Sequence, residues 1–239
     1  NVFVILTFVL SVSLLMVMSL FYAGLNTATK RQVENMQHVI YYGLSEEQLA
    51  DMAAEGEPTS YVLGMKQGQG VEIEGIMISP VAYTSEPLKD KGVDLEPVTP
   101  KKGRMPETEE EILLPDAYCS LAGITPEPGE KVSFTWLDGT TEEYTISGIF
   151  HAEDNMSVYT VVFSEAYAVN GSQLKDVLWQ GIVCLNGAEE MTQAEFEDTV
   201  YSLGTDLGVE RRNVNVNNFF MDTLPGGEQQ AQETVAIAG

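Results

Sequence analysis

The feature that most constrains this chain is an uninterrupted apolar segment near its amino end. Residues 2–22 read VFVILTFVLSVSLLMVMSLFY and contain no charged residue, no proline and no glycine. At about 1.5 Å per helical residue, roughly 21 residues reach about 30 Å, the thickness of the hydrocarbon core of a bilayer. The segment therefore predicts a transmembrane helix, and the rest of the fold has to suit a chain held at a membrane.

Two other interpretations of this segment are weaker. A secretory signal peptide carries a shorter apolar core, about 7–15 residues, behind a basic start, and this segment is longer and lacks the basic start. A helix buried in a globular core would show a polar stripe, whereas this segment offers only four scattered hydroxyl side chains, on Thr7, Ser11, Ser13 and Ser19.

Both ends of the chain are interpreted as membrane connections. Residues 23–35 are polar and compatible with a helix, so we expect the membrane helix to continue as a stalk within a first segment, 1–35. Lys30 and Arg31 slightly favour a cytoplasmic position for that end, but the large acidic domain that follows outweighs them and favours an extracytoplasmic one. The chain turns small and apolar over residues 233–239, which predicts that residues 225–239 are the lead-in to a second membrane helix.

The remainder of the chain is strongly acidic. The 239 residues include 36 Asp and Glu against 12 Lys and Arg, a formal net charge of -24. Nucleic-acid binding requires a basic surface that displaces counterions from phosphates, so this function is excluded. The charge also repels anionic lipid headgroups, so we expect the folded body to stand off the membrane, although it could attract cations or cationic peptides.

A strand–helix–strand unit follows the stalk. Residues 37–42 (QHVIYY) are β-branched and aromatic, which predicts a strand. Ser45 and Gln48 have the spacing of a capping box, which predicts the start of a helix. Tyr61–Leu63 then begin a second strand.

A second unit of the same kind lies near the other end. Residues 179–185 (WQGIVCL) and 214–216 predict strands, and Thr192 with Glu195 forms a second capping box at the start of the helix between them. The apolar stripe of that helix consists of Phe196, Val200, Leu203 and Leu207. We predict that the two units build one layered subdomain from residues 36–69 and 172–224.

The middle of the chain, residues 70–171, is richer in strands. Residues 132–136 and 144–147 alternate apolar and polar side chains, and the Asp138-Gly139 pair between them predicts a type I′ hairpin turn. Residues 157–163 (SVYTVVF) predict another strand. The expected fold class is therefore α+β: a transmembrane helix, a layered β-α-β/β-α-β subdomain, and a small β-rich subdomain inserted into it.

Three short motifs carry a family resemblance. Gly103-Arg104-Met105-Pro106, followed by Glu111-Ile112-Leu113-Leu114, is similar to a "G-R-x-P … E-I" segment. Pro128-Gly129-Glu130-Lys131-Val132 is similar to "G-D-x-V", with Glu130 in place of Asp, and residues 144–150 are similar to "Y-x-V-x-G-I". Together with the order of the predicted elements, these motifs resemble the extracytoplasmic domain of FtsX-like and MacB-like permeases, the membrane subunits of a class of ABC transporters.

The motif residues also have structural interpretations. Gly103 and Pro106 bracket a turn in which Arg104 could pair with a nearby carboxylate. Gly129 permits a tight approach to the next strand, and Gly148 suggests a bulge or a close backbone contact.

The resemblance implies a mechanical function rather than passage of substrate through a membrane pore. A separate ATP-binding subunit would move the membrane helices of a permease homo- or heterodimer in the bacterial cell membrane. Residues 23–35 would then act as a lever on the extracytoplasmic domain, which would act on an extracellular substrate or partner in export, lipoprotein handling or peptide sensing.

No catalytic, cofactor-binding or metal-binding residue is predicted, and we do not expect an enzyme. His38 is interpreted as a surface or packing residue of a strand, and His151 lies beside Glu153 and Asp154, where a metal or acid–base site has little support. Cys119 and Cys184 are too far apart in sequence for a C-x-x-C motif; one disulfide could form outside the cell, but two buried free thiols are favoured.

Two alternative functions remain open. The first is a signal-anchored extracellular binding or adhesion protein without an ATPase. The second is a membrane-tethered hydrolase that uses two carboxylates, for which the acidic run Glu107–Glu111 offers candidates, although such a run is more typical of a solvated turn.

Overall fold

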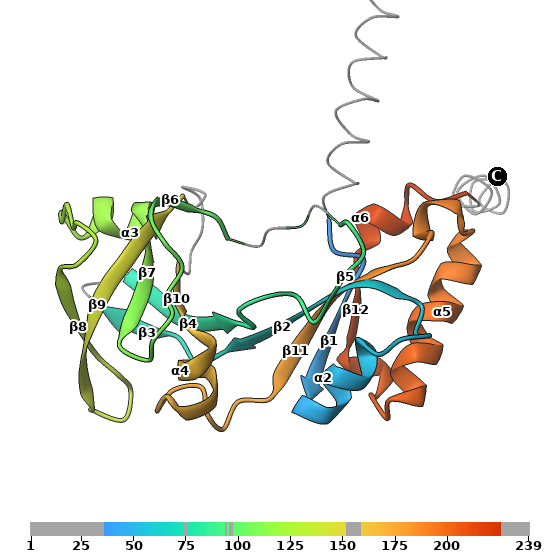
Figure 1. The fold of residues 1–239 in the computed structure, drawn as a ribbon, viewed down its shortest axis with the longest axis horizontal. Coiled ribbons are helices and arrows are strands. Elements are labelled where there is room, and N and C mark those ends of the chain that lie inside the picture. Colours follow the sequence, from blue (N-terminus) through green and yellow to red (C-terminus); the bar gives the residue numbers. More distant parts are fainter. Residues whose placement is uncertain (1–35, 74–75, 94, 96–97, 152–158, 226–239) are drawn as a thin grey trace, which may run out of the picture. The chain divides into compact units, whose positions relative to one another are not determined.

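The computed structural model describes residues 36–73, 76–93, 95, 98–151 and 159–225 of the chain (Figure 1). The predicted membrane helix and stalk, residues 1–35, lie outside these residues, as does nearly all of the predicted second lead-in. Within the described ranges, no helix combines the length and the apolar composition that crossing a membrane requires.

A mixed sheet dominates the described body (Figure 1). Its strand order is β12-β1-β11-β2-β4-β10-β7-β9-β6, and three further strands pair beside this path, β3 with β4, β5 with β2 and β8 with β9. The strands are β1 (Val39–Leu44), β2 (Thr59–Gln67), β3 (Val71–Ile73), β4 (Ile76–Tyr83), β5 (Lys89–Asp90), β6 (Pro100–Gly103), β7 (Glu111–Pro115), β8 (Lys131–Thr135), β9 (Thr141–Phe150), β10 (Tyr159–Phe163), β11 (Trp179–Leu185) and β12 (Val214–Val216).

In the described body fewer residues lie in helices than in strands, so the body is a sheet-dominated α+β fold. The helices are α2 (Glu46–Met52), α3 (Asp116–Leu121), α4 (Glu165–Asn170), α5 (Gln193–Asp206) and α6 (Asn218–Met221), with 3₁₀ turns η1 (Ala188–Glu190) and η2 (Arg211–Asn213).

The two predicted strand–helix–strand units interlock within this sheet. The strands β12, β1, β11 and β2 are consecutive neighbours and each pair is antiparallel. Strand β11 therefore lies between β1 and β2, and β1 lies between β11 and β12, which is the split β-α-β arrangement of ferredoxin-like sheets. Each unit leaves a gap that a strand of the other unit fills.

Both predicted capping boxes are present. The Ser45 hydroxyl accepts the N–H of Gln48 at 3.1 Å, and the Gln48 side chain accepts the N–H of Ser45 at 2.8 Å. Thr192 and Glu195 make the equivalent pair at the start of α5. Of the predicted apolar stripe on α5, Phe196, Val200 and Leu203 are buried, whereas Leu207 is the half-buried C-cap.

The predicted type I′ turn between β8 and β9 is wrong. The N–H of Gly139 donates to the Trp136 carbonyl at 2.9 Å, and the N–H of Trp136 donates to the Thr140 carbonyl at 2.8 Å. This is a three-residue loop in which Gly139, at φ +82°, takes the left-handed position after a type I turn. An Asp-Gly pair is compatible with the two-residue type I′ loop and with the three-residue loop, because both place a glycine at positive φ. The strand register, in which Thr135 pairs with Thr141, selects the three-residue loop.

Strand β2 is shared by the two parts of the body. Residues 59–65 of this strand pair with β11 and residues 65–67 pair with β4, so Met65 has a partner in each, Gln180 and Tyr83. The short strand β5, although it falls within residues 70–171, pairs with the first half of β2. The division into 36–69 with 172–224 and 70–171 stays a prediction. We use "split β-α-β part" for β1, residues 59–65 of β2, β5, β11, β12, α2, α5 and α6, and "inserted part" for β3, β4, β6–β10, α3 and α4.

Candidate functional site

The described body begins beside the short helix α6, at a contact that we call the β1–α6 junction and define by Gln37, His38, Asn217 and Phe220. Strand β1 pairs with β12 through Val39–Val216 and Tyr41–Val214. The N–H of Asn217 donates to the His38 carbonyl at 2.9 Å, and its side-chain amide donates to the Gln37 carbonyl at 2.8 Å. Figure 1 shows β1, β12 and α6 together at this end of the sheet. The residues that lead into β1 and out of β12 are therefore joined directly.

The His38 side chain is the centre of the junction. Its ring stacks on Phe220 with centroids 4.0 Å apart and meets the edge of Phe196 at 6.1 Å. Nδ1 accepts the N–H of Leu185 at 2.9 Å, so the neutral ring carries its proton on Nε2. Burial lowers the pKa of His38 to about 4, against a smaller opposing effect of Glu189. His38 is thus a packing residue, one of the two roles predicted for it.

Asn217 links the end of the body to its beginning by a second route. Its side-chain oxygen accepts the N–H of Phe220 at 3.2 Å and caps the short helix α6. The same side chain therefore orders α6 and holds the residue that precedes β1. This dual role depends on tertiary packing, and only the preference of Asn for helix N-caps could have pointed to it.

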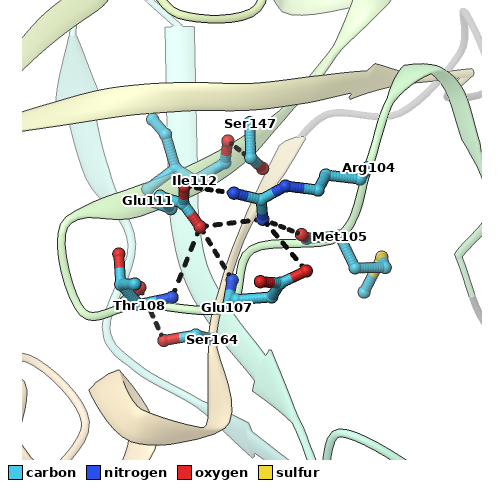
Figure 2. A network of polar contacts seen from close by, with 8 residues as sticks. All are labelled: Arg104, Met105, Glu107, Thr108, Glu111, Ile112, Ser147 and Ser164. Carbon is cyan, nitrogen blue, oxygen red and sulfur yellow. Dashed lines mark hydrogen bonds and ion pairs between the residues drawn. The ribbon is translucent and has the colours of Figure 1, made fainter.

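The Arg104 motif builds a second polar network, between β6, β7 and β9 (Figure 2). The Arg104 guanidinium contacts both oxygens of Glu111, at 2.9 and 2.6 Å, in a bidentate pair. Glu111 also accepts the N–H of Glu107 at 2.9 Å. The hydrogen bond from Arg104 is the main reason that the pKa of Glu111 lies below its usual range. The predicted pairing of Arg104 with a carboxylate is confirmed.

Two hydroxyl groups and two glycines complete this network. The Ser147 hydroxyl donates to the Ile112 carbonyl at 2.9 Å, and the Ser164 hydroxyl donates to the Thr108 carbonyl at 2.8 Å (Figure 2). A Cβ at Gly148 would lie 2.5 Å from the Lys102 carbonyl oxygen. A Cβ at Gly103, where φ is +80°, would lie closer still to the facing strand, 2.2 Å from the Ser147 carbonyl oxygen. The close backbone contact predicted at Gly148 is present, and the motif serves to join three strands.

The acidic run also borders a surface pocket of about 470 Å³ between the β8–β9 hairpin and α4. The pocket contains Glu109, Glu110, Glu142 and Glu143 together with Tyr144 and Tyr167. One oxygen of Glu142 accepts from Trp136 Nε1 at 2.9 Å, from the Tyr167 hydroxyl at 3.2 Å and from the Tyr144 hydroxyl. This carboxylate therefore organises an aromatic cluster. Glu111, at the end of the run, is only 16% exposed and is held by Arg104, so the predicted solvated turn is wrong at that residue.

The remaining chemical candidates take surface or packing positions. His151 Nδ1 lies 2.9 Å from Asp116 Oδ2, while Glu153 and Asp154 fall outside the described residues. Within the described ranges, no three His, Cys, Asp or Glu side chains are grouped to hold a metal ion. Cys119 and Cys184 are both buried and are not joined by a disulfide.

Sequence reasoning missed two buried lysines. Lys66 on β2 and Lys89 on β5 are only 5% and 7% exposed, and the ammonium groups of both donate to main-chain carbonyls. Lysine is normally a surface residue, and nothing in the local pattern signals burial. Only the packing of distant segments around these strands reveals their roles.

Comparison with known proteins returned structural neighbours only. No protein-family model and no curated protein matches the sequence. The periplasmic region of MacB from Actinobacillus actinomycetemcomitans is similar in structure, with 11% identity and a TM-score of 0.48, over 86% of this chain and 95% of that one. A domain of a putative permease from Porphyromonas gingivalis has 8% identity and a TM-score of 0.47, over 77% and 89%.

A third neighbour is the extracellular domain of the noncanonic ABC-type transporter YknZ from Gram-positive bacteria. It has 15% identity and a TM-score of 0.43, over 76% of this chain and 99% of that one.

Proposed function

We propose that this chain is the extracytoplasmic domain of an ABC transporter permease subunit. In this proposal it couples ATPase-driven movement of membrane helices to an extracellular substrate or partner. The proposal includes a separate ATP-binding subunit, a homo- or heterodimer of permease subunits, and a location at the bacterial cell membrane. It draws on the motifs at Gly103–Pro106, Pro128–Val132 and Tyr144–Phe150, and above all on the β1–α6 junction.

The junction supports a coupling role for a mechanical reason. The segment that follows the predicted stalk and the segment that precedes the predicted second lead-in meet through Asn217 and His38. A displacement of either segment would therefore act on the other, and His38 would also pass it to β11 through its hydrogen bonds with Val183 and Leu185. Because β1 is also paired along its length with β11, the displacement would continue into the body as a movement of paired strands.

The contacts of the junction suit this role because most of them are buried. His38 and Phe220 are 5% and 1% exposed. Separating them would expose aromatic surface and break the main-chain bonds of Asn217, so the junction resists being pulled apart. A flexible loop in this place would absorb a displacement instead of passing it on.

The test begins with purification of the tagged parent protein from the membranes of its own bacterium. We expect an ATP-binding subunit to copurify, and mass spectrometry would identify it. The coupling is then measured as the change in ATPase rate when a nanobody raised against the described body binds the complex in nanodiscs. We expect Asn217→Ala to weaken that response, because it removes the side-chain bonds to Gln37 and Phe220.

Asn186→Ala is the matched control. Asn186 also donates a side-chain hydrogen bond to a main-chain carbonyl, that of Thr59 at 2.9 Å, but lies outside the junction. We expect this variant to keep the wild-type response. Purification without an ATP-binding subunit would favour the adhesion alternative. An ATPase that ignores the nanobody, or equal loss of response in both variants, would contradict coupling through the junction.

A further inference from the structure

The chain crosses between the split β-α-β part and the inserted part on either side of β5 and at two further places, and these two lie against each other. Strand β2 makes the outward crossing at Met65–Gln67, where its partner changes from β11 to β4. The segment 171–178, between α4 and β11, makes the return crossing. Whether the two parts can pivot depends on what joins these crossings.

Lys66 joins them directly. The Lys66 side chain extends from β2 to the return crossing. Its Nζ donates to the carbonyl oxygens of Ala168 at 2.9 Å, Leu174 at 3.2 Å and Lys175 at 3.4 Å. An ammonium group has three N–H donors, so these three carbonyls use all of them. The group also lies over the ring of Trp179, the first residue of β11, with 5.0 Å between Nζ and the ring centroid. One buried cation thus touches α4, the return crossing and the strand that follows it.

The backbone beside Lys66 is also closely packed. A Cβ at Gly64 would lie 2.7 Å from the Leu49 and Thr84 side chains, so α2 and the end of β4 both close onto β2 there. On the other side, the N–H of Gly68 donates to the Pro80 carbonyl at 2.8 Å. The outward crossing therefore offers no loose residue at which β2 could bend.

We propose that Lys66 locks the two crossings together, so that the split β-α-β part and the inserted part move as one rigid body. The Lys66 ammonium group must keep its hydrogen bonds to the three carbonyls, because burying an ammonium group without acceptors costs free energy. Conversely, pivoting the inserted part would draw those carbonyls away from Nζ. This inference does not depend on the proposed function, since it concerns the described body alone and requires no partner.

Lys89 provides a matched control within the same chain. It is as buried as Lys66, and its Nζ donates to the carbonyls of Ala54 at 2.9 Å and Glu57 at 3.3 Å and to the Thr59 hydroxyl at 3.0 Å. These contacts join β5 to the α2–β2 connection and do not bridge the two crossings. Lys66→Met and Lys89→Met therefore remove similar buried ammonium groups with different expected effects on movement between the parts.

The test uses the full chain in detergent. Pulsed electron–electron double resonance measures the distance between a spin label on each part. Spin labels are attached at Leu137→Cys on the β8–β9 hairpin and at Asp198→Cys on α5, both at exposed positions. Burial raises the pKa of Cys119, and that of Cys184 to about 12, so the native thiols react slowly with the label.

We expect a narrow distance distribution for the wild-type chain and for Lys89→Met, and a distribution about twofold broader for Lys66→Met. A narrow distribution in a folded Lys66→Met chain, or equal broadening in both variants, would overturn the proposal. If circular dichroism shows that Lys66→Met does not fold, Lys66→Gln decides instead. Its shorter, neutral side chain has only two N–H donors, so the distribution should broaden, and a narrow one would refute the lock.

Discussion

Protonation of His38 should weaken the folded state in a defined pH window. The folded-state pKa of His38 is lowered from 6.5 to about 4, mainly by burial. Between these two values the unfolded chain binds a proton at His38 that the folded chain does not, so stability rises with pH across the window. The stabilising effect is fully present above pH 6.5 and is lost as the pH falls toward 4.

The magnitude follows from the size of this shift. One pKa unit corresponds to about 1.4 kcal/mol, so the free energy of unfolding should fall by about 3 kcal/mol across the window. The structure supplies the cause: Nδ1 already accepts the N–H of Leu185, and the ring is packed against Phe196 and Phe220. A proton on Nδ1 would remove that hydrogen bond and bury a charge among aromatic rings.

The assay compares urea unfolding of the wild-type chain and of His38→Gln at several pH values. Many carboxylates titrate in the same range, but they are common to both chains, so the difference between the two unfolding free energies isolates His38. A second measurement is direct. The chain has two histidines, so His151→Gln leaves His38 as the only imidazole whose titration is followed by proton NMR. Parallel stability curves, or a titration midpoint near pH 6.5, would refute the buried neutral ring.

Three further substitutions test the local packing, each by the free energy of chemical unfolding. Gly148→Ala places a methyl group 2.5 Å from a facing carbonyl oxygen, so we expect a loss of about 2 kcal/mol or more, and unchanged stability would mean that β6 and β9 can separate freely. Thr192→Ala removes the N-cap of α5 and should cost about 1 kcal/mol, whereas the mid-helix Thr199→Ala should be nearly neutral; equal costs would contradict the capping role. Tyr41→Phe deletes a buried hydroxyl that donates to a carbonyl of α5 at 2.7 Å and should cost about 1 kcal/mol, against little for Tyr42→Phe; the reverse order would show that this bond is not stabilising.

Features that depend on neighbours in sequence were predicted well. The capping boxes at Ser45 and Thr192 link residues three positions apart, and strand β11 follows directly from its run of apolar and aromatic residues. The Arg104–Glu111 pair was within reach because its partners lie only seven residues apart. The hairpin after β8 shows the limit of local reasoning, since Asp138-Gly139 is compatible with two loops and the strand register selects one.

The role of the junction was less accessible. His38 was predicted to lie in a strand, whereas β1 begins one residue later, at Val39. Its stacking partner Phe220 lies far along the chain and has no local signal. The same holds for Lys66, whose three acceptors are about a hundred residues away. Hydropathy places lysine at the surface, and only the convergence of several backbone carbonyls can make its burial favourable.

The apolar character of residues 2–22, the acidic charge, the two helices with capping boxes and most strands can be predicted from the amino-acid sequence, because propensity, patterning and charge act over a few residues. The order β12-β1-β11-β2, the contact between Asn217 and Gln37, and the burial of Lys66 at the crossings are properties of the folded chain. Strand order and buried polar partners depend on which distant backbone groups meet. That outcome is set by the packing free energy of the whole body and not by any one segment.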